Sequence, residues 1–341
     1  MSRLTSKVLK EISYQTGSYT ITPEFVSLIL TMKCNFHCQS CSIWQKTNHD
    51  ELNESAWKNI IEQLKINLKP ETFIELNGGE ALLRKDLVIF CIKELKKHFY
   101  KVVLNTNGLL INQELLNELK LSSLDAIKLS LYSLNSKNHN DLRGHENAYE
   151  HAINAVKLIN KSEIDLEIGL LITSKNISEA PKLIQYLQTL PKTSIILQPL
   201  DEKVESVESK KQNSNNLISY LWPTPEQVKI FIDWVLKNRS HIKNPAVNIK
   251  VIRDYYLHPE SVLKYRCFAG QRNLVIYPNG DVSFCFKHSV IGNPTKQNLI
   301  SILQNAKEKR RAIKHCKKYC RIIGCNFSRG FKEFMMAKIK L

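Results

Sequence analysis

The chain has 341 residues, and 43% of them are hydrophobic, which is enough to build one large core and a smaller satellite domain. The sequence contains no run of 18 or more apolar residues, and residues 1–25 lack the apolar segment of a signal peptide. We therefore expect a cytoplasmic protein without a membrane span. A reducing compartment would keep its nine cysteines as thiols, available to a metal or to catalysis.

The formal net charge is +17, and residues 306–341 contain twelve Lys or Arg against two Glu. Such a charge could attract nucleic acid, an acidic peptide or an anionic metabolite. The same stretch holds three cysteines, whose thiolates would offset part of the charge, and a Lys-, Asn- and Ile-rich chain often reflects coding bias. No RRM, KH or basic-helix signature is present, so nucleic acid is not expected as a partner.

Between residues 24 and 200, short β-branched runs alternate with longer amphipathic stretches, which predicts a parallel α/β sheet. Helical stretches follow five of the six runs. The expected strands are Phe25–Thr31, Thr72–Leu76, Lys101–Asn105, Ala126–Leu131, Ile164–Thr173 and Ser194–Leu197. Because parallel sheets bind ligands at the carboxyl ends of their strands, the residues just after each run are the candidates for chemistry.

Start signals support several helices. Asn176 and Glu179 form a capping-box-like pair before an apolar helical face, and Asp86 precedes another. A further helix is expected from Pro225 through Val235. We expect a barrel domain at residues 1–200 with its core at 25–200, a Ser- and Asn-rich linker at 201–222, and a cysteine-rich domain at 223–341.

The loop after the first expected strand reads CxxxCxxC, with Cys34, Cys38 and Cys41 able to converge on one metal centre. A structural zinc site would need a fourth protein ligand, such as His37, His49 or a distant cysteine. An iron-sulfur cluster held by three thiolates instead leaves one iron free for an exogenous ligand.

A Gly78-Gly79-Glu80 sequence follows the second expected strand. The combination of this sequence with CxxxCxxC resembles the radical S-adenosylmethionine (SAM) superfamily. The two glycines would let backbone carbonyls approach an ammonium group, and Glu80 would position the strand end. The resemblance implies a partial (β/α)6 TIM-like barrel. Ser40 departs from the family, which usually has an aromatic residue before the third cysteine.

The resemblance also implies the cofactors and the reaction. SAM would chelate the open iron of a 4Fe-4S cluster and, on reduction, yield a 5′-deoxyadenosyl radical that abstracts a substrate hydrogen. An electron donor such as flavodoxin or ferredoxin would be required. The family places further SAM contacts at Asn107, Ser130 and Arg143. Each has an ordinary alternative: a turn for Asn107, a cap for Ser130 and a surface salt bridge for Arg143. Gln198 is another expected lining residue.

The C-terminal cysteines provide an independent argument. Residues 274–281 read as a β-hairpin with a glycine turn, which would bring Cys267 and Cys285 together. Three later cysteines follow a helix-like stretch: Cys316, Cys320 and Cys325. The pattern resembles the SPASM or Twitch extension of radical SAM enzymes. A full SPASM domain has seven cysteines for two clusters, so five cysteines imply one auxiliary 4Fe-4S cluster. A zinc knuckle is the alternative.

The leading hypothesis is therefore a radical SAM enzyme that abstracts hydrogen from a peptide or a small molecule, assisted by an auxiliary cluster. The competing hypothesis is a non-catalytic zinc or iron-sulfur protein that binds nucleic acid through its basic tail. Cys91 lies on the apolar face of an expected helix, and we interpret it as a buried structural residue.

Overall fold

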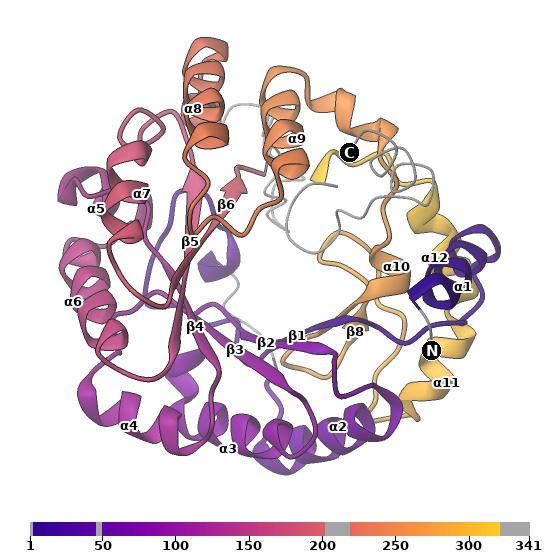
Figure 1. Ribbon diagram of the computed structural model, residues 1–341. Coiled ribbons are helices and arrows are strands. Elements are labelled where there is room, and N and C mark those ends of the chain that lie inside the picture. Colours follow the sequence, from indigo (N-terminus) through magenta and orange to yellow (C-terminus); the bar gives the residue numbers. More distant parts are fainter. Residues whose placement is uncertain (1–2, 46–49, 202–218, 321–341) are drawn as a thin grey trace.

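The computed structural model describes residues 3–45, 50–201 and 219–320. Its centre is an eight-stranded sheet in the order β6-β5-β4-β3-β2-β1-β7-β8, in which every pair is parallel except β7 with β8. The sheet curves into an open barrel with helices on its outside (Figure 1). The predicted α/β barrel is thus confirmed. No helix among the described residues is long and apolar enough to cross a lipid bilayer.

All six predicted strands are present, with ends shifted by a few residues. They are β1 (Phe25–Ile29), β2 (Phe73–Asn77), β3 (Lys101–Thr106), β4 (Ala126–Ser130), β5 (Asp165–Ile172) and β6 (Thr193–Pro199). The helices between them are α2 (Glu54–Asn67), α3 (Lys85–Lys96), α4 (Gln113–Leu121), α5 (Ser136–Arg143), α6 (Ala148–Asn160) and α7 (Ala180–Gln188). Parallel neighbours require such crossover helices.

One predicted start signal is wrong. Helix α7 begins at Ala180 behind an N-cap at Glu179, which makes no side-chain cap. The Asn176 side chain is fully buried, accepts hydrogen bonds from the Thr173 backbone and hydroxyl, and donates to the Tyr132 and Leu171 carbonyls. Asn176 therefore stabilises the loop after β5, because it supplies hydrogen-bond partners to buried backbone groups there. Asp86 lies inside the first turn of α3.

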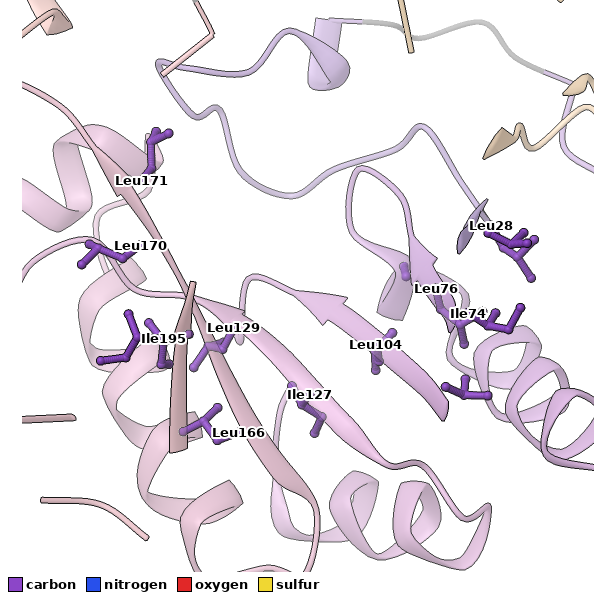
Figure 2. Close-up of a cluster of buried hydrophobic side chains, with 14 of the residues drawn as sticks. Leu28, Ile74, Leu76, Leu104, Ile127, Leu129, Leu166, Leu170, Leu171 and Ile195 are labelled. Carbon is purple, nitrogen blue, oxygen red and sulfur yellow. The ribbon is translucent and has the colours of Figure 1, made fainter. Parts of the chain in front are cut away.

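The outward faces of the strands form the main core. Leu28, Leu76 and Leu104 are fully buried and, like Ile127 and Leu129 further along, point toward the helix layer (Figure 2). Burial of each such side chain contributes roughly 1.5–3 kcal/mol. Because side chains alternate along a strand, the residues between them point into the barrel.

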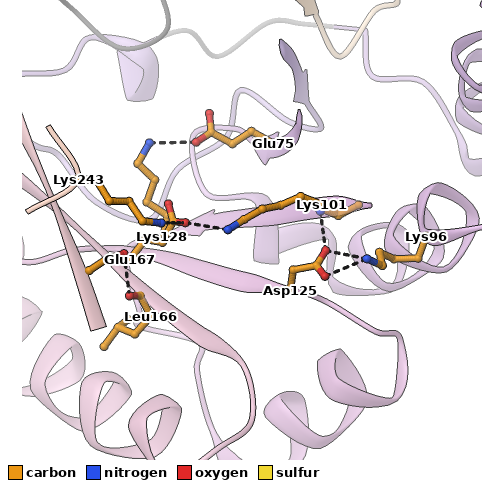
Figure 3. Close-up of polar contacts among 10 residues, drawn as sticks. Glu75, Lys96, Lys101, Asp125, Lys128, Leu166, Glu167 and Lys243 are labelled. Carbon is orange, nitrogen blue, oxygen red and sulfur yellow. Dashed lines mark hydrogen bonds and ion pairs between the residues drawn. The ribbon is translucent and has the colours of Figure 1, made fainter. Parts of the chain in front are cut away.

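The inward faces of β2 to β5 are polar. The Lys128 ammonium lies 3.0 Å from a Glu75 carboxylate oxygen, and Glu167 pairs with both Lys101 and Lys243 (Figure 3). Asn77 and Asn105 continue this layer toward the carboxyl ends of the strands. Glu75 and Glu167 are buried, so their ion pairs form a polar layer inside the barrel.

The C-terminal part joins the same sheet. Strand β7 (Asn273–Ile276) pairs in parallel with β1 and turns at Gly280 into β8 (Val282–Ser283), which confirms the predicted hairpin. The remaining helices are α1 (Arg3–Thr16), α8 (Pro225–Lys237), α9 (Ala246–Leu257), α10 (Ala269–Arg272), α11 (Leu299–Asn305) and α12 (Lys307–Lys314). Helix α8 was predicted, and its capping box joins Thr224 and Gln227. One hydrophobic cluster extends from Val26 to Ile313, so both parts of the chain share a core.

Candidate active site

The CxxxCxxC segment forms a loop between β1 and a short 3-10 helix at Ile43–Gln45. Phe36 is fully buried, and Cys34, Cys38 and Cys41 pack in the cluster around it. All three are free thiols. Burial raises the pKa of Cys34 to about 11; the Phe36 backbone lowers it, and the nearby Cys38 and Cys41 raise it further. The structure therefore gathers the three cysteines in one loop, and their role as cluster ligands stays a prediction.

The end of β2 packs directly on this loop. The Gly79 N–H donates to the Thr31 carbonyl at 2.9 Å, and the Glu80 N–H donates to the Lys33 carbonyl at 2.8 Å. A Cβ at Gly79 would lie 2.2 Å from the Lys33 carbonyl oxygen, so only glycine fits. Gly78 is similarly close to Thr31. The two glycines thus permit close contact with the start of the cysteine loop, and their predicted role toward an ammonium group stays a prediction.

Glu80 joins the end of β2 to the end of β3. Its buried carboxylate accepts hydrogen bonds from the Thr106 hydroxyl at 2.9 Å and from the backbone N–H groups of Asn107 and Leu82. Burial raises the pKa of Glu80, while the Asn107 and Leu82 hydrogen bonds oppose that rise. The Asn107 side chain in turn donates to Asn35 in the cysteine loop at 2.7 Å. The ends of β2 and β3 therefore both support the cysteine loop.

Helix α5 supports the loop from another side. The Leu142 carbonyl accepts a hydrogen bond from the Gln39 N–H, and Gly144 adopts a left-handed conformation with φ +61°. A Cβ at Gly144 would lie 2.2 Å from the His37 carbonyl oxygen. The Asp-Leu-Arg-Gly sequence therefore ends a helix and seats it on the loop. A glycine directly after a helix is the signal that could have indicated this C-cap.

Arg143 is buried, so the surface salt bridge that was its alternative is absent. Its guanidinium lies 5.4 Å from the Phe36 ring centroid and donates to the Tyr132 hydroxyl at 2.9 Å. Burial alone would lower its pKa, but Cys38, Tyr132 and Cys34 hold the pKa of Arg143 above the ordinary value. Sequence reasoning missed the contacts with Phe36 and Tyr132, because aromatic residues carry no spacing signature of their own.

Ser130 lies at the end of β4, opposite Gly169 in the register with β5. A Cβ at Gly169 would lie 3.3 Å from the Gln198 side-chain oxygen, so Gln198 occupies the space beside that glycine. Ser130 and Gln198 thus line the inner face near the strand ends. Their contacts with SAM or substrate stay predictions.

The described C-terminal cysteines also converge. Cys267 precedes α10, Cys285 follows β8, Cys316 follows α12, and Cys320 is the last described residue. Burial raises the pKa of Cys285 to about 11, and Cys320 and Cys316 add to this rise. Burial also raises the pKa of Cys320 to about 11, with Cys267 among its charged neighbours. Cys325 lies outside the described residues. Cys91 is fully buried in α3, in agreement with its predicted structural role.

The donor chemistry fits iron-sulfur clusters. Within the described ranges, no three His, Cys, Asp or Glu side chains surround one point closely enough to hold a single metal ion. A four-iron cluster places each thiolate on a different iron, so its ligands need only surround a common space. Each cysteine group supplies free thiols, and within each group the thiols shift one another's pKa.

Comparisons with known proteins agree with this chemistry. A radical SAM superfamily model matches residues 28–187, and an iron-sulfur cluster-binding domain model, SPASM, matches residues 267–326. The AdoMet-dependent heme synthase of Methanosarcina barkeri is 23% identical, over 86% of this chain and 85% of that protein. The PqqA peptide cyclase of Granulibacter bethesdensis is 23% identical, over 75% and 66% respectively.

Solved structures share the fold. Streptococcus suis SuiB bound to SAM has a TM-score of 0.64 at 16% identity, covering 91% of this chain and 72% of SuiB. SuiB bound to its precursor peptide SuiA has a TM-score of 0.65 at 17% identity, covering 90% and 70%. The two family models together match more than half of the chain. The cofactors are a 4Fe-4S cluster, SAM and auxiliary iron-sulfur clusters. The chain therefore belongs to the radical SAM superfamily, as an enzyme with a SPASM extension.

Proposed function

We propose that Cys34, Cys38 and Cys41 hold the SAM-binding cluster and that the enzyme abstracts a hydrogen atom from a peptide substrate. The observation that carries the ligand assignment is the support of one cysteine loop by the ends of β2 and β3 and by α5. A loop fixed from several sides can hold three thiolates in place with little reorganisation.

Several residues around the loop are proposed SAM contacts. Gly78, Gly79 and Asn107 lie at the strand ends nearest the cysteines, and Ser130 lies further along the same edge. Arg143, at the end of α5, lies against Phe36 in the cysteine loop. Glu80 acts on this edge as a positioning residue, because its carboxylate accepts hydrogen bonds from the end of β3 and from the turn after β2. When bound, the cluster and SAM supply a carbon radical after one-electron reduction.

The electron would come from a flavodoxin or a ferredoxin. The net charge of +17 would favour the approach of an acidic donor protein. We place the protein in the cytoplasm, because reduced thiols and low-potential donors occur together there.

We further propose that Cys267, Cys285, Cys316 and Cys320 hold an auxiliary 4Fe-4S cluster. Their mutual influence on pKa supports this set. Cys325 would then be a bystander or a ligand of a second site. The auxiliary cluster would accept an electron from the substrate or bind the substrate directly.

The inner face of the barrel has two walls that a substrate would meet. Glu75 and Lys128 lie on the polar wall. The second wall is a separate apolar cluster that joins both ends of the cysteine loop to the β7–β8 hairpin. It is formed by Ile29, Met32 and Val275 with Ile43 and Tyr277. Phe286, 61% exposed and next to Cys285, extends this wall. A peptide, with alternating polar backbone and apolar side chains, matches both walls.

The named relatives support a peptide, since one is a PqqA peptide cyclase and SuiB was crystallised with a precursor peptide. The second candidate is a small-molecule substrate, which the AdoMet-dependent heme synthase favours because this chain spans most of its length.

Anaerobic reconstitution tests the proposed chemistry. We expect about eight iron and eight sulfide per chain, and formation of 5′-deoxyadenosine from SAM upon reduction. Stoichiometric zinc without SAM cleavage would overturn the proposal in favour of the non-catalytic metalloprotein. Mass spectrometry of short peptides encoded beside the gene would test the substrate class. A modified heme precursor with all peptides unchanged would favour the small-molecule alternative.

A further inference from the structure

Arg143 is a buried cation without an acidic partner. Only 7% of the residue is exposed, and no ion pair joins it to a carboxylate among the described residues. Among the described residues, its buried Nε has no hydrogen-bond partner, and Nη1 donates to the Tyr132 hydroxyl. The charge of Arg143 lowers the pKa of Glu80, so the two side chains interact electrostatically. The Glu80 carboxylate oxygens, however, accept hydrogen bonds from the end of β3 and from the turn after β2. A buried guanidinium in this state carries a desolvation cost that a nearby anion offsets.

The position of the guanidinium indicates which anion would compensate its charge. It stacks on Phe36, which stands between Cys34 and Cys38 in the loop, and both of those cysteines favour its charged form. The next residue, Gly144, packs closely on the His37 backbone, so the backbone that carries Arg143 is held against the cysteine loop. The guanidinium is therefore held against the cysteine loop, close enough to Cys38 and Cys34 to interact with their charges.

We propose that Arg143 is the built-in counter-charge of the cluster held by Cys34, Cys38 and Cys41, raising the reduction potential of that cluster and helping to retain it. The inference rests on the ligand set proposed above. A three-thiolate cluster is anionic and gains further negative charge on reduction, so a fixed cation nearby stabilises the reduced form. This role is exerted on the cluster itself and differs from pairing with the carboxylate of SAM.

The chain offers a matched control in Arg310. It is 2% exposed and stacks 4.8 Å from the ring centroid of Phe284, the neighbour of Cys285. Its Nε and Nη2 donate to the Gly270 and Leu303 carbonyls. Burial lowers the pKa of Arg310 to about 10, and only Tyr19 opposes that change. Arg310 thus shares burial, aromatic stacking and an unpartnered guanidinium nitrogen with Arg143, but no cysteine among the described residues raises its pKa.

The test is an EPR-monitored redox titration of the reconstituted full-length protein without SAM, with Cys267 and Cys285 replaced by Ala so that one cluster is observed. In Arg143→Met we expect about a tenfold lower ratio of reduced to oxidised cluster at a fixed potential, equivalent to about 59 mV for one electron. Arg143→Lys should recover most of the difference, and Arg310→Met should change the ratio less than twofold.

Apo-protein melting provides a second readout. Arg143→Met should melt at or above the apo wild type, because it removes an uncompensated charge, while Arg310→Met should melt lower because it loses two hydrogen bonds. An unchanged SAM-free potential in Arg143→Met overturns the proposal, even if SAM affinity falls. If Arg143→Met fails to retain iron, the iron content of Arg143→Lys becomes the readout. Equal loss of iron in Arg143→Lys overturns the proposal, and normal iron retention in Arg143→Lys supports it. A wrong ligand set is recognised separately, since removal of Cys34, Cys38 and Cys41 would then leave the iron content unchanged.

Discussion

The two cysteine groups are built in different ways. Cys34, Cys38 and Cys41 lie within eight consecutive residues, and their loop is fixed by the ends of β2 and β3 and by α5. Cys267, Cys285, Cys316 and Cys320 come from four separate positions around α10, the β7–β8 hairpin and α12. The first group is therefore a local structure supported by its surroundings, whereas the second exists only after distant segments have packed together. Loss of one supporting contact should therefore weaken cluster binding at the first site gradually. Loss of one packed segment should weaken cluster binding at the second site cooperatively.

The largest expected effect is the loss of the first site. Replacement of Cys34, Cys38 and Cys41 by Ala should remove about four iron per chain and abolish SAM cleavage, while the auxiliary iron stays. Iron analysis and measurement of 5′-deoxyadenosine check both points. Retained cleavage would show that another cysteine group activates SAM.

The reciprocal change should separate the two sites. Replacement of Cys267 and Cys285 by Ala should also remove about four iron, but uncoupled SAM cleavage should continue while substrate turnover stops. Full turnover in this variant would mean that the auxiliary cluster is merely structural or absent.

A smaller effect should follow from disturbing the support of the first loop. Gly144→Ala forces a left-handed residue to carry a Cβ, at a cost of roughly 1–2 kcal/mol, and drives that atom toward the His37 carbonyl. We expect a lower free energy of unfolding and weaker retention of iron at the first site. Gly169→Ala is the control, because its Cβ would meet only the end of the Gln198 side chain at 3.3 Å. Urea unfolding and iron analysis of both variants test this prediction. Equal losses of stability and of iron in the two variants would contradict a specific role for the α5 C-cap.

The smallest effect concerns pH and the same helix. His139 of α5 is fully buried, and burial, followed by the charge of Arg143, lowers its pKa to about 3. A base whose pKa falls on folding stabilises the native state above its unfolded pKa and loses that contribution as pH falls toward the folded pKa. From pH 7 to 5.5 the apo protein should lose about 1.4 kcal/mol through this group.

The control is His139→Gln, which keeps an acceptor for the Tyr132 backbone N–H that now donates to Nδ1. Urea unfolding of both proteins at the two pH values isolates the histidine contribution. If the wild type loses no more free energy of unfolding than the variant, protonation of His139 does not destabilise the folded protein, and the prediction is wrong.

Much of this structure was predictable from local pattern. The six strands, the helix from Pro225 and the hairpin at Gly280 follow from apolar periodicity and turn residues, which act over a few neighbours. The error at Asn176 has the opposite origin. Its side chain satisfied the capping pattern, but the buried backbone of Thr173 and Tyr132 offered better partners once the strands had assembled.

The sequence by itself determined the chemistry: CxxxCxxC after a strand, Gly78 to Glu80 after the next, and the later cysteines. Only the tertiary structure decided that β7 would pair with β1, that Glu80 would link two strands, and that Arg143 would lie buried against Phe36. The reason is physical. Residue type and spacing fix which ligands are available, while burial and the distance between charges depend on segments far apart in the chain, which come together only when the barrel closes.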